Sequence, residues 1–337
     1  MKQFSLSQAQ PAARAARTAA LGLALMAASG ITAAASSYDL MRFEDPRGPD
    51  TNFFPTGINN SMAVAGTASF QHGFKLTGLN AAGLPASITV FDVPGAFNNS
   101  TFGDDINNGG VIVGSYRNGT GSHGFILDGA LGGVVTTIDV PGGVAGRTTL
   151  TGLNDSGQVV GTYMDANFNT LGFVLTGSNF TLLNAGLAQP NTLAQGINDA
   201  GRVVGFIGGG GTASRGFTFE AGSYAIFDAP GAAWTQAYGI NNAGVIVGAA
   251  STGLFVKDGA TFATLDLPTS WNARNAVATD INDQGVVVGY FTDNTTNLTY
   301  GFLASPTAPV PEPGTWLLMV GGLLPALVRR ARTRRAA

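Results

Sequence analysis

One pattern of polar and hydrophobic positions recurs along the chain. Position by position, it is Gly/Asp–Ile/Leu–Asn–Asn/Asp–x–Gly–x–Val/Ile–Val–Gly, where x is any residue. The first Asn of the pattern recurs every 41–48 residues, at Asn59, Asn107, Asn154, Asn198, Asn241 and Asn282. A period of this length predicts a body built from six similar structural units.

Two further elements complete most units. A Gly followed by Phe or Leu comes about 15–20 residues after each Asn, at 73–74, 124–125, 172–173, 216–217, 253–254 and 301–302. An Asp-x-Pro element then follows at 92–94, 139–141, 228–230 and 266–268, whereas the third unit reads Thr-Leu-Leu-Asn at 181–184.

The pattern predicts four short strands in each unit. The first strand ends just before the Asn, and the Asn-Asn/Asp-x-Gly tetrad is typical of a tight turn, in which Asx side chains bond the backbone and Gly takes the left-handed conformation. The second strand is apolar at consecutive positions, which indicates burial on both faces. The third strand carries Gly-Phe, and the fourth ends in the Asp-x-Pro element. Four strands per 41–48 residues are typical of a β-propeller blade.

The ends of the repeat array predict a closed ring. The sixth unit stops at Ser305 without a fourth strand, and Phe43-Glu44-Asp45-Pro46 aligns with Phe91-Asp92-Val93-Pro94 as an extra one. We therefore predict an all-β, six-bladed β-propeller over residues 36–305, closed by its N-terminal strand. An open β-solenoid is the alternative.

Composition and charge exclude some classes of function for this body. The chain has 49 Gly and no Cys, so no disulfide or thiolate site can form. All 20 acidic residues lie between Asp39 and Glu312, with only 9 of the 17 basic residues, which gives this span a net charge of −11. Such a body repels nucleic acid, so we expect no nucleic-acid partner.

The N-terminus has the anatomy of a signal peptide. Lys2, Arg14 and Arg17 precede an apolar stretch at 19–31, and Ala33-Ala34-Ala35 follows as a small-residue cleavage site. We expect signal peptidase to cut after Ala35. The alternative is a permanent anchor, although the apolar run is shorter than the ~20 residues of a spanning helix.

The C-terminus has three parts in a fixed order. A linker at 306–314 holds Pro311, Glu312 and Pro313, an apolar stretch follows at 315–328, and residues 329–337 carry five Arg. The 14 apolar residues would form a short transmembrane helix of ~21 Å. The Arg cluster is expected to keep the tail in the cytoplasm.

This ordered arrangement resembles the PEP-CTERM sorting signal, with Pro311, Glu312 and Pro313 as its motif. The resemblance implies a Gram-negative bacterium that makes exopolysaccharide, and recognition by an exosortase, a membrane protease-transpeptidase. It also implies a transient inner-membrane anchor, followed by delivery to the cell surface or extracellular matrix. An ordinary C-terminal anchor is the alternative.

The repeat itself is similar to the HAF repeat of bacterial extracellular proteins. The resemblance covers residues 54–304, and its histidine is matched at His72 and His123 only. It implies an extracellular setting and no defined activity.

The sequence offers few candidates for chemistry. His72 and His123 occupy equivalent positions, but Leu, Arg, Thr and Tyr fill the same place in other units, which favours a tolerated position over a metal site. The Asp of each Asp-x-Pro element is interpreted as a turn cap. No phosphate loop and no nucleophile elbow is present. We therefore predict no catalytic residues, no metal, no cofactor and no enzyme.

The variable loops are the expected binding region. The connections at 117–122, 164–170, 208–214 and 292–299 differ in length and chemistry, and they share one face with Trp234 and Trp271. These two Trp either stack against sugar rings or cap the packing between blades. The leading hypothesis is a non-enzymatic surface protein that binds exopolysaccharide or another protein. The alternative is a propeller hydrolase or lyase acting on extracellular glycans.

The sorting hypothesis predicts the effect of a truncation. Removing everything after Ser305 should release the body into the medium, because the motif and the anchor are lost. Immunoblots of medium and cell fractions measure this. Continued retention on the cell surface would show that the body itself attaches the protein there.

Overall fold

The computed structural model describes residues 38–45, 48, 51–68, 71–79, 85–97, 100–129, 133–185, 191–208 and 213–307. The expected signal peptide, Pro-Glu-Pro motif, apolar helix and basic tail lie outside these residues. Within them, no helix has the length and apolar character needed to cross a membrane.

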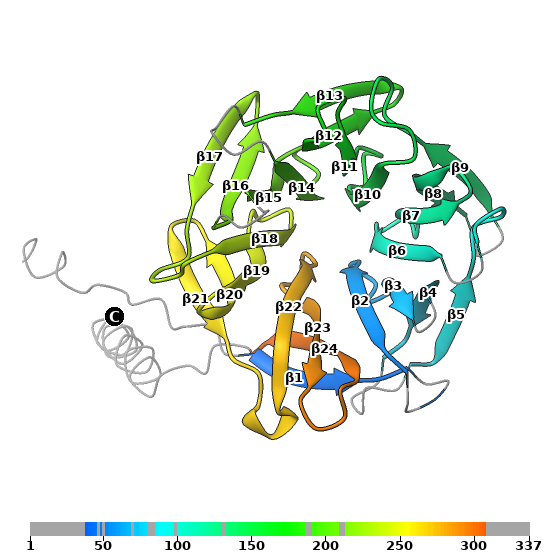
Figure 1. The fold of residues 1–337 in the computed structure, drawn as a ribbon. Helices are drawn as coiled ribbons and strands as arrows, with labels where there is room; N and C mark the ends of the chain where they lie inside the picture. The colour runs from blue at the N-terminus through cyan, green and yellow to red at the C-terminus, as the bar shows by residue number, and fades with distance from the viewer. Residues whose placement is uncertain are drawn as a thin grey trace, which may run out of the picture. The chain divides into compact units, whose positions relative to one another are not determined.

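The described residues form six four-stranded antiparallel sheets that follow one another around a ring (Figure 1). Blade 1 contains β2 (Phe53–Ile58), β3 (Val64–Ala68), β4 (His72–Thr77) and β5 (Ser87–Phe91). Blade 2 contains β6 (Thr101–Ile106), β7 (Ile112–Asn118), β8 (Gly121–Asp128) and β9 (Val134–Ile138). Blade 3 contains β10 (Thr148–Leu153), β11 (Val159–Met164), β12 (Thr170–Thr176) and β13 (Asn179–Leu183).

The second half of the ring repeats this order. Blade 4 contains β14 (Thr192–Ile197), β15 (Val203–Ile207), β16 (Arg215–Glu220) and β17 (Ser223–Phe227). Blade 5 contains β18 (Thr235–Ile240), β19 (Ile246–Ala250), β20 (Gly253–Asp258) and β21 (Thr261–Leu265), followed by a 3₁₀ turn, η1 (Thr269–Trp271). Blade 6 contains β22 (Ala273–Ile281), β23 (Val287–Asp293), β24 (Thr299–Pro306) and β1 (Tyr38–Phe43).

The predicted closure by the N-terminal strand is confirmed. β1 pairs with β24 along its whole length, from Tyr38 opposite Pro306 to Phe43 opposite Gly301. Phe43 is buried, and its ring meets that of Phe53 in blade 1 edge to face, 5.9 Å between centroids. The first strand of the body thus completes the last blade and covers the edge that β24 would otherwise expose.

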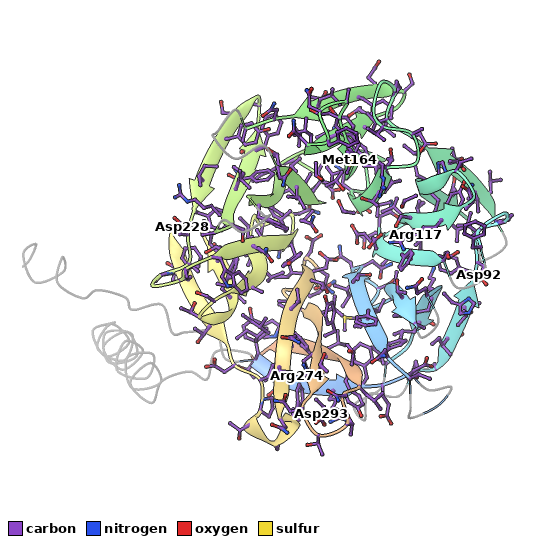
Figure 2. All side chains as sticks on the ribbon, viewed as in Figure 1. Asp92, Arg117, Met164, Asp228, Arg274 and Asp293 are labelled. Carbon is purple, nitrogen blue, oxygen red and sulfur yellow. The ribbon has the colours of Figure 1, made fainter. Side chains whose placement is uncertain are left out.

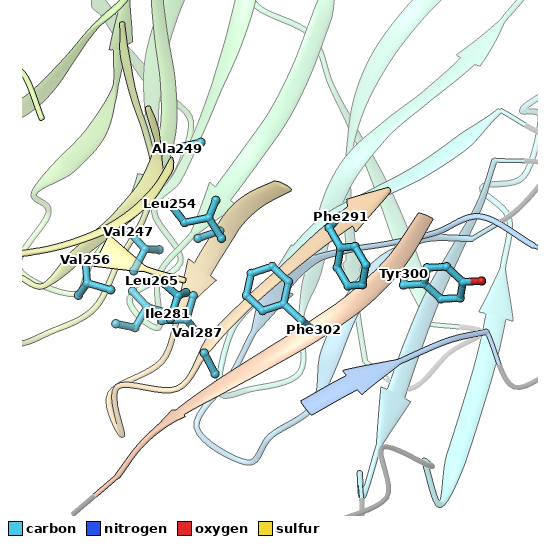
Figure 3. Close-up of a cluster of buried hydrophobic side chains, with 12 residues drawn as sticks. Val247, Ala249, Leu254, Val256, Leu265, Ile281, Val287, Phe291, Tyr300 and Phe302 are labelled. Atoms are coloured by element: carbon cyan, nitrogen blue, oxygen red, sulfur yellow. The ribbon is translucent and has the colours of Figure 1, made fainter. Parts of the chain in front are cut away.

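The hydrophobic core lies between neighbouring blades. The cluster in Figure 3 joins Val247 and Leu254 of blade 5 to Ile281, Phe291 and Phe302 of blade 6. The second strand of every blade is buried at nearly every position, as its run of apolar residues predicts. Each blade therefore needs a partner on both sides, and only a closed ring supplies six such pairs.

Close packing explains the Gly that ends the repeated pattern. A Cβ at Gly161 would collide with the carbonyl oxygen of Thr149 and lie 2.8 Å from the ring of Phe173. The equivalent Gly in the other five blades meets the innermost strand and the Phe of the third strand in the same way. The third-strand Phe can pack in every blade because this Gly leaves room for it.

The six repeated Asn side chains form a closed ring of hydrogen bonds. Each amide nitrogen donates to the backbone carbonyl of the next Asn around the ring, at 2.9–3.3 Å. Each amide oxygen accepts the backbone N–H four residues on, at 2.9–3.0 Å. We call these six residues the Asn hoop: Asn59, Asn107, Asn154, Asn198, Asn241 and Asn282.

A second ring of hydrogen bonds lies beside the Asn hoop. The residue after each hoop Asn donates its backbone N–H to the side-chain oxygen of the equivalent residue in the next blade, at 2.7–2.9 Å. The members of this outer hoop are Asn60, Asn108, Asp155, Asp199, Asn242 and Asp283. The predicted tight turns are confirmed, and the structure adds that their side chains also join each blade to the next.

The irregular first turn keeps the geometry of the others. Met62 stands where the other five blades have Gly, and it takes the same left-handed backbone, with φ of 61° against 77–82° for those Gly. A non-glycine residue in this region costs roughly 1–2 kcal/mol. The hoop hydrogen bonds of Asn59 therefore hold the turn despite an unfavourable residue.

The Asn hoop predicts a selective loss of stability. Asn198→Asp keeps the acceptor but replaces the buried donor to Asn241 by a carboxylate, so we expect a loss of about 2–4 kcal/mol in the free energy of unfolding. Asp199→Asn is the matched control, because Asn already occupies this exposed outer-hoop position in three blades and its amide oxygen can still accept from Asp155 N, so it should cost less than about 1 kcal/mol. Urea unfolding measures both, and equal costs would show that the hoop does not join the blades.

Candidate functional site

The ring has two faces of different construction. The Asn-containing turns lie on one face, which we call the turn face. On the other, the loop face, the connection entering a blade meets the loop between the second and third strands of that blade or of the blade before it. Arg117 N donates to Ser100 O at 2.9 Å, Thr235 N to Ser214 O at 2.8 Å, and Ser251 N to Trp234 O at 3.1 Å. These bonds hold variable loops on a rigid scaffold, the usual setting of a binding site.

Pairs of charged and polar side chains mark the edge of the loop face. Nδ1 of His72 lies 2.8 Å from Asp92, Nδ1 of His123 lies 2.9 Å from Asp139, and Arg215 binds Asp228 through two nitrogens. In each pair, the residue before the Gly-Phe element faces the Asp of the Asp-x-Pro element in the same blade. Asp92 and Asp228 lie on opposite sides of the rim in Figure 2.

These pairs correct the interpretation of the repeated Asp as a turn cap, because the carboxylates of Asp92, Asp139 and Asp228 bind the third strand instead. A different residue supports the turn: a buried Thr at the start of the next inner strand accepts the backbone N–H that follows the Asp, as Thr235 does from Ala229 at 2.9 Å. Within the described residues, no cluster of three His, Asp or Glu has metal-binding geometry.

Trp234 lies on the loop face beside a shallow hollow. Its side chain remains 37% exposed, and Ala213, Ser214, Ala233 and Gln236 line a hollow of about 450 Å³ with it. The backbone is held on both sides, since Ala233 N donates to Ser251 Oγ at 2.7 Å and Trp234 O accepts from Ser251 N. The hollow thus offers a fixed aromatic ring, a hydroxyl and an amide to a ligand.

Trp271 has a different role from Trp234. Its ring stacks on Phe291, with 5.2 Å between centroids and 11° between planes, and it covers the cluster between blades 5 and 6. Both Trp lie on connections into a new blade, as the sequence predicts. The structure brings only Trp234 to an open hollow, whereas Trp271 caps the packing between blades.

The axial cavity on the turn face contains acidic groups that the sequence analysis missed. It has a volume of about 70 Å³ and is lined by both hoops and by Asp105 and Asp280. These two Asp stand just before the Ile of the first strand, where the other four blades have Gly. Asp105 accepts from Leu153 N and Asp280 from Ile58 N, each at 2.9 Å and each across a blade boundary. A comparison of the six copies could have found them as departures from Gly.

Burial raises the pKa of three carboxyls near the axis. The pKa of Asp104 rises to about 8 through burial and the neighbouring charge of Asp105, and that of Asp105 rises to about 7 through burial. Burial, and then the charge of Asp105, raises the pKa of Asp280 well above its ordinary value. Asp104 takes the bulge position where Thr56, Thr151 and Thr279 donate hydroxyls to carbonyls of the next blade. A protonated carboxyl can donate there, and a carboxylate cannot.

The raised pKa values predict that the free energy of unfolding falls as the pH rises. The folded protein binds more protons than the unfolded chain between about pH 4 and pH 8, so the stabilisation present at low pH is lost as the pH rises through 8. Asp104→Asn cannot ionise, and it should gain about 1–3 kcal/mol over the unmodified protein at pH 8.5. At pH 4.5 the gain should shrink to about 1 kcal/mol or less, because only the unfolded carboxyl ionises there. Urea unfolding across this range measures the effect, and parallel pH profiles would contradict it.

Comparison with known proteins gives similarity at the level of overall structure. No family model and no curated protein sequence matches the chain. Among solved structures, a gluconolactonase from Xanthomonas campestris is 10% identical with a TM-score of 0.49, over 82% of this chain and 93% of that chain. The fungal lectin of Aleuria aurantia, described as a six-bladed β-propeller, is 12% identical with a TM-score of 0.44, over 82% and 98%. Trypanosoma rangeli sialidase is 9% identical with a TM-score of 0.47, over 85% and 61%. Values this low carry no argument about activity, and the six-bladed fold stands on the structure described above.

Proposed function

We propose that this protein is an exported bacterial surface or matrix protein whose propeller binds a polysaccharide. The ends of the sequence support the first part: an N-terminal signal pattern, and the ordered Pro-Glu-Pro, apolar and Arg-rich C-terminus that resembles an exosortase substrate. In this proposal signal peptidase and an exosortase-type protease process the chain, and the transient membrane anchor is then lost.

The exposed ring of Trp234 is the observation that carries the binding function. A Trp face is large, rigid and apolar, and it loses little conformational entropy when a ligand packs on it. One face of a sugar ring presents C–H groups that can cover such a surface, while its hydroxyls bond neighbouring polar groups. Ser214 and Gln236 supply such groups beside Trp234.

An extracellular hydrolase or lyase is the alternative function. The observation in its favour is the group of axial carboxyls with raised pKa, because glycoside hydrolysis uses one protonated and one ionised carboxyl. Against it, the axial cavity of about 70 Å³ has room for a few water molecules but not for a pyranose ring. Asp105 and Asp280 also accept backbone hydrogen bonds that join blades, which is a structural role.

Substitution of Trp234 tests the binding function. The mature protein, purified from its exporting host, should be retained on a matrix of the host's exopolysaccharide. Trp234→Ala should lower the affinity at least about tenfold, because the stacking surface is lost. Trp234→Phe should keep part of the affinity.

Trp271→Ala is the matched control. It should lower the free energy of unfolding by about 2–4 kcal/mol through lost packing on Phe291, yet the folded fraction should keep its affinity. Full retention of a folded Trp234→Ala variant would remove this residue from the site. Shortening of the polysaccharide during incubation would favour the enzymatic alternative.

A further inference from the structure

Exposed aromatic side chains gather on the loop face. Among the described residues, five large apolar side chains are exposed: Phe97, Val134, Phe168, Leu182 and Trp234. The three aromatic ones all lie on the loop face, on connections of different blades. The two aliphatic ones, Val134 and Leu182, lie on the outermost strands β9 and β13.

Phe168 is held away from any packing partner by a strained backbone. It is 74% exposed and has φ of 64°, and it is the sole aromatic among the seven non-glycine residues with positive φ in the described part of the chain. This conformation is a genuine outlier for a bulky side chain, and such strain concentrates at functional sites. The turn between β11 and β12 imposes this conformation, as the equivalent turns do at Gln71 and Asn297, and Phe168 is the aromatic residue placed there with its ring in solvent.

Asp165 organises the loop that presents Phe168. One carboxylate oxygen accepts the backbone N–H of Asn167 at 2.9 Å and of Asn169 at 2.8 Å, and the other accepts the Asn169 side chain at 3.1 Å. Phe168 N donates to Asp165 O at 3.0 Å. These bonds lower the pKa of Asp165 below the usual range of an Asp carboxyl. Asp165 is therefore ionised at neutral pH, and its carboxylate holds the loop in one conformation before any ligand binds.

Phe97 is presented in a similar way on another connection. It is 56% exposed, and its backbone N–H donates to Arg117 O at 2.8 Å, which ties it to the end of β7 in the next blade. Its ring lies beside the β7–β8 turn at Gly119. Phe97, Phe168 and Trp234 therefore lie on the β5–β6, β11–β12 and β17–β18 connections. These connections follow one another around the ring (Figure 1).

We propose that Phe97, Phe168 and Trp234 are three stacking subsites for one class of ligand, a neutral polysaccharide that binds the loop face at several points. The proposal rests on the polysaccharide-binding function and names its ligand class and its further contacts. A protein partner would favour one contiguous apolar patch, whereas these rings stand apart among amides, hydroxyls and carboxylates. A glycan presents apolar ring faces at intervals, with hydroxyls between them.

Charge selects a neutral glycan over an anionic one. The span between Asp39 and Glu312 carries a net charge of −11. On the loop face Arg215 is already paired with Asp228, and Arg42 lies over the ring of Tyr300 and near Asp293. Of the other Arg on this face, Arg117 lies over the ring of Phe102 and Arg274 donates to Asn297, so neither is neutralised by a carboxylate. The net negative charge of the body as a whole is therefore what disfavours a polyanion.

Several subsites on one rigid ring predict avidity. Binding at one subsite raises the effective concentration of the same glycan chain at the others, so a polymer gains affinity that a short oligomer cannot. Loss of one ring should then weaken polymer binding strongly. The same loss at Phe97 or Phe168 should leave the binding of a disaccharide at Trp234 unchanged.

The test uses the mature exported protein with Phe97→Ala, Phe168→Ala and Trp234→Ala, and with Val134→Ala and Leu182→Ala as exposed controls. The probes are the neutral and anionic fractions of the host's extracellular polysaccharide, and disaccharides prepared from the neutral fraction. We expect each aromatic substitution to weaken binding of the neutral polymer roughly tenfold or more, and the aliphatic controls to have no effect. The anionic fraction should bind least.

Phe168→Asn separates function from folding. Asn tolerates the left-handed backbone, so this variant should keep or raise the melting temperature while it loses polymer affinity. If the unmodified protein binds no polysaccharide, both the proposed function and this inference fail. If Trp234→Ala alone weakens binding, or if Phe97→Ala and Phe168→Ala lose a co-purifying protein instead, the proposed function stands and the three-subsite inference is overturned.

Discussion

The Asn hoop is the interaction on which the rest of the structure depends. Each of its six side chains does two things at once: it closes its own turn through the amide oxygen, and it binds the next blade through the amide nitrogen. Five of the six are buried, so a missing partner would leave a polar group without compensation. On the turn face no chain segment runs from one blade to the next, and the hoop supplies a hydrogen bond there between each blade and its neighbour.

The closed hoop gives the two faces of the ring different roles. On the turn face the repeated Asn, Asp and Gly positions are occupied by ring closure, and the outer-hoop carboxylates accept backbone and amide N–H groups. Little freedom remains there for ligand recognition. The loop face carries none of this constraint, so its connections vary in length and present exposed rings on a rigid support.

The axial carboxyls show the cost of placing acids inside such a ring. Asp105 and Asp280 replace Gly in two blades separated by blade 1, and the charge of Asp105 is among the causes that raise the pKa of Asp280. Their backbone acceptor bonds partly offset this, since each also joins its blade to the next. Asp104 has no such acceptor role, which makes it the carboxyl most dependent on protonation.

Local signals in the sequence were enough to determine the blades, their number and the closing strand. The repeated turns, the doubly apolar second strands and the Phe43–Asp45 segment are readable because each depends on neighbouring residues along the chain. The tertiary structure decided the rest. Asn198 binds Asn241, Asp280 binds Ile58, and Trp271 stacks on Phe291 while Trp234 stays open, because ring closure sets the distance between residues of different blades. Phe168 depends on both levels, since its positive φ comes from local bonds within the Asp165–Asn169 turn, whereas its exposure is decided by the place of that turn on the folded ring.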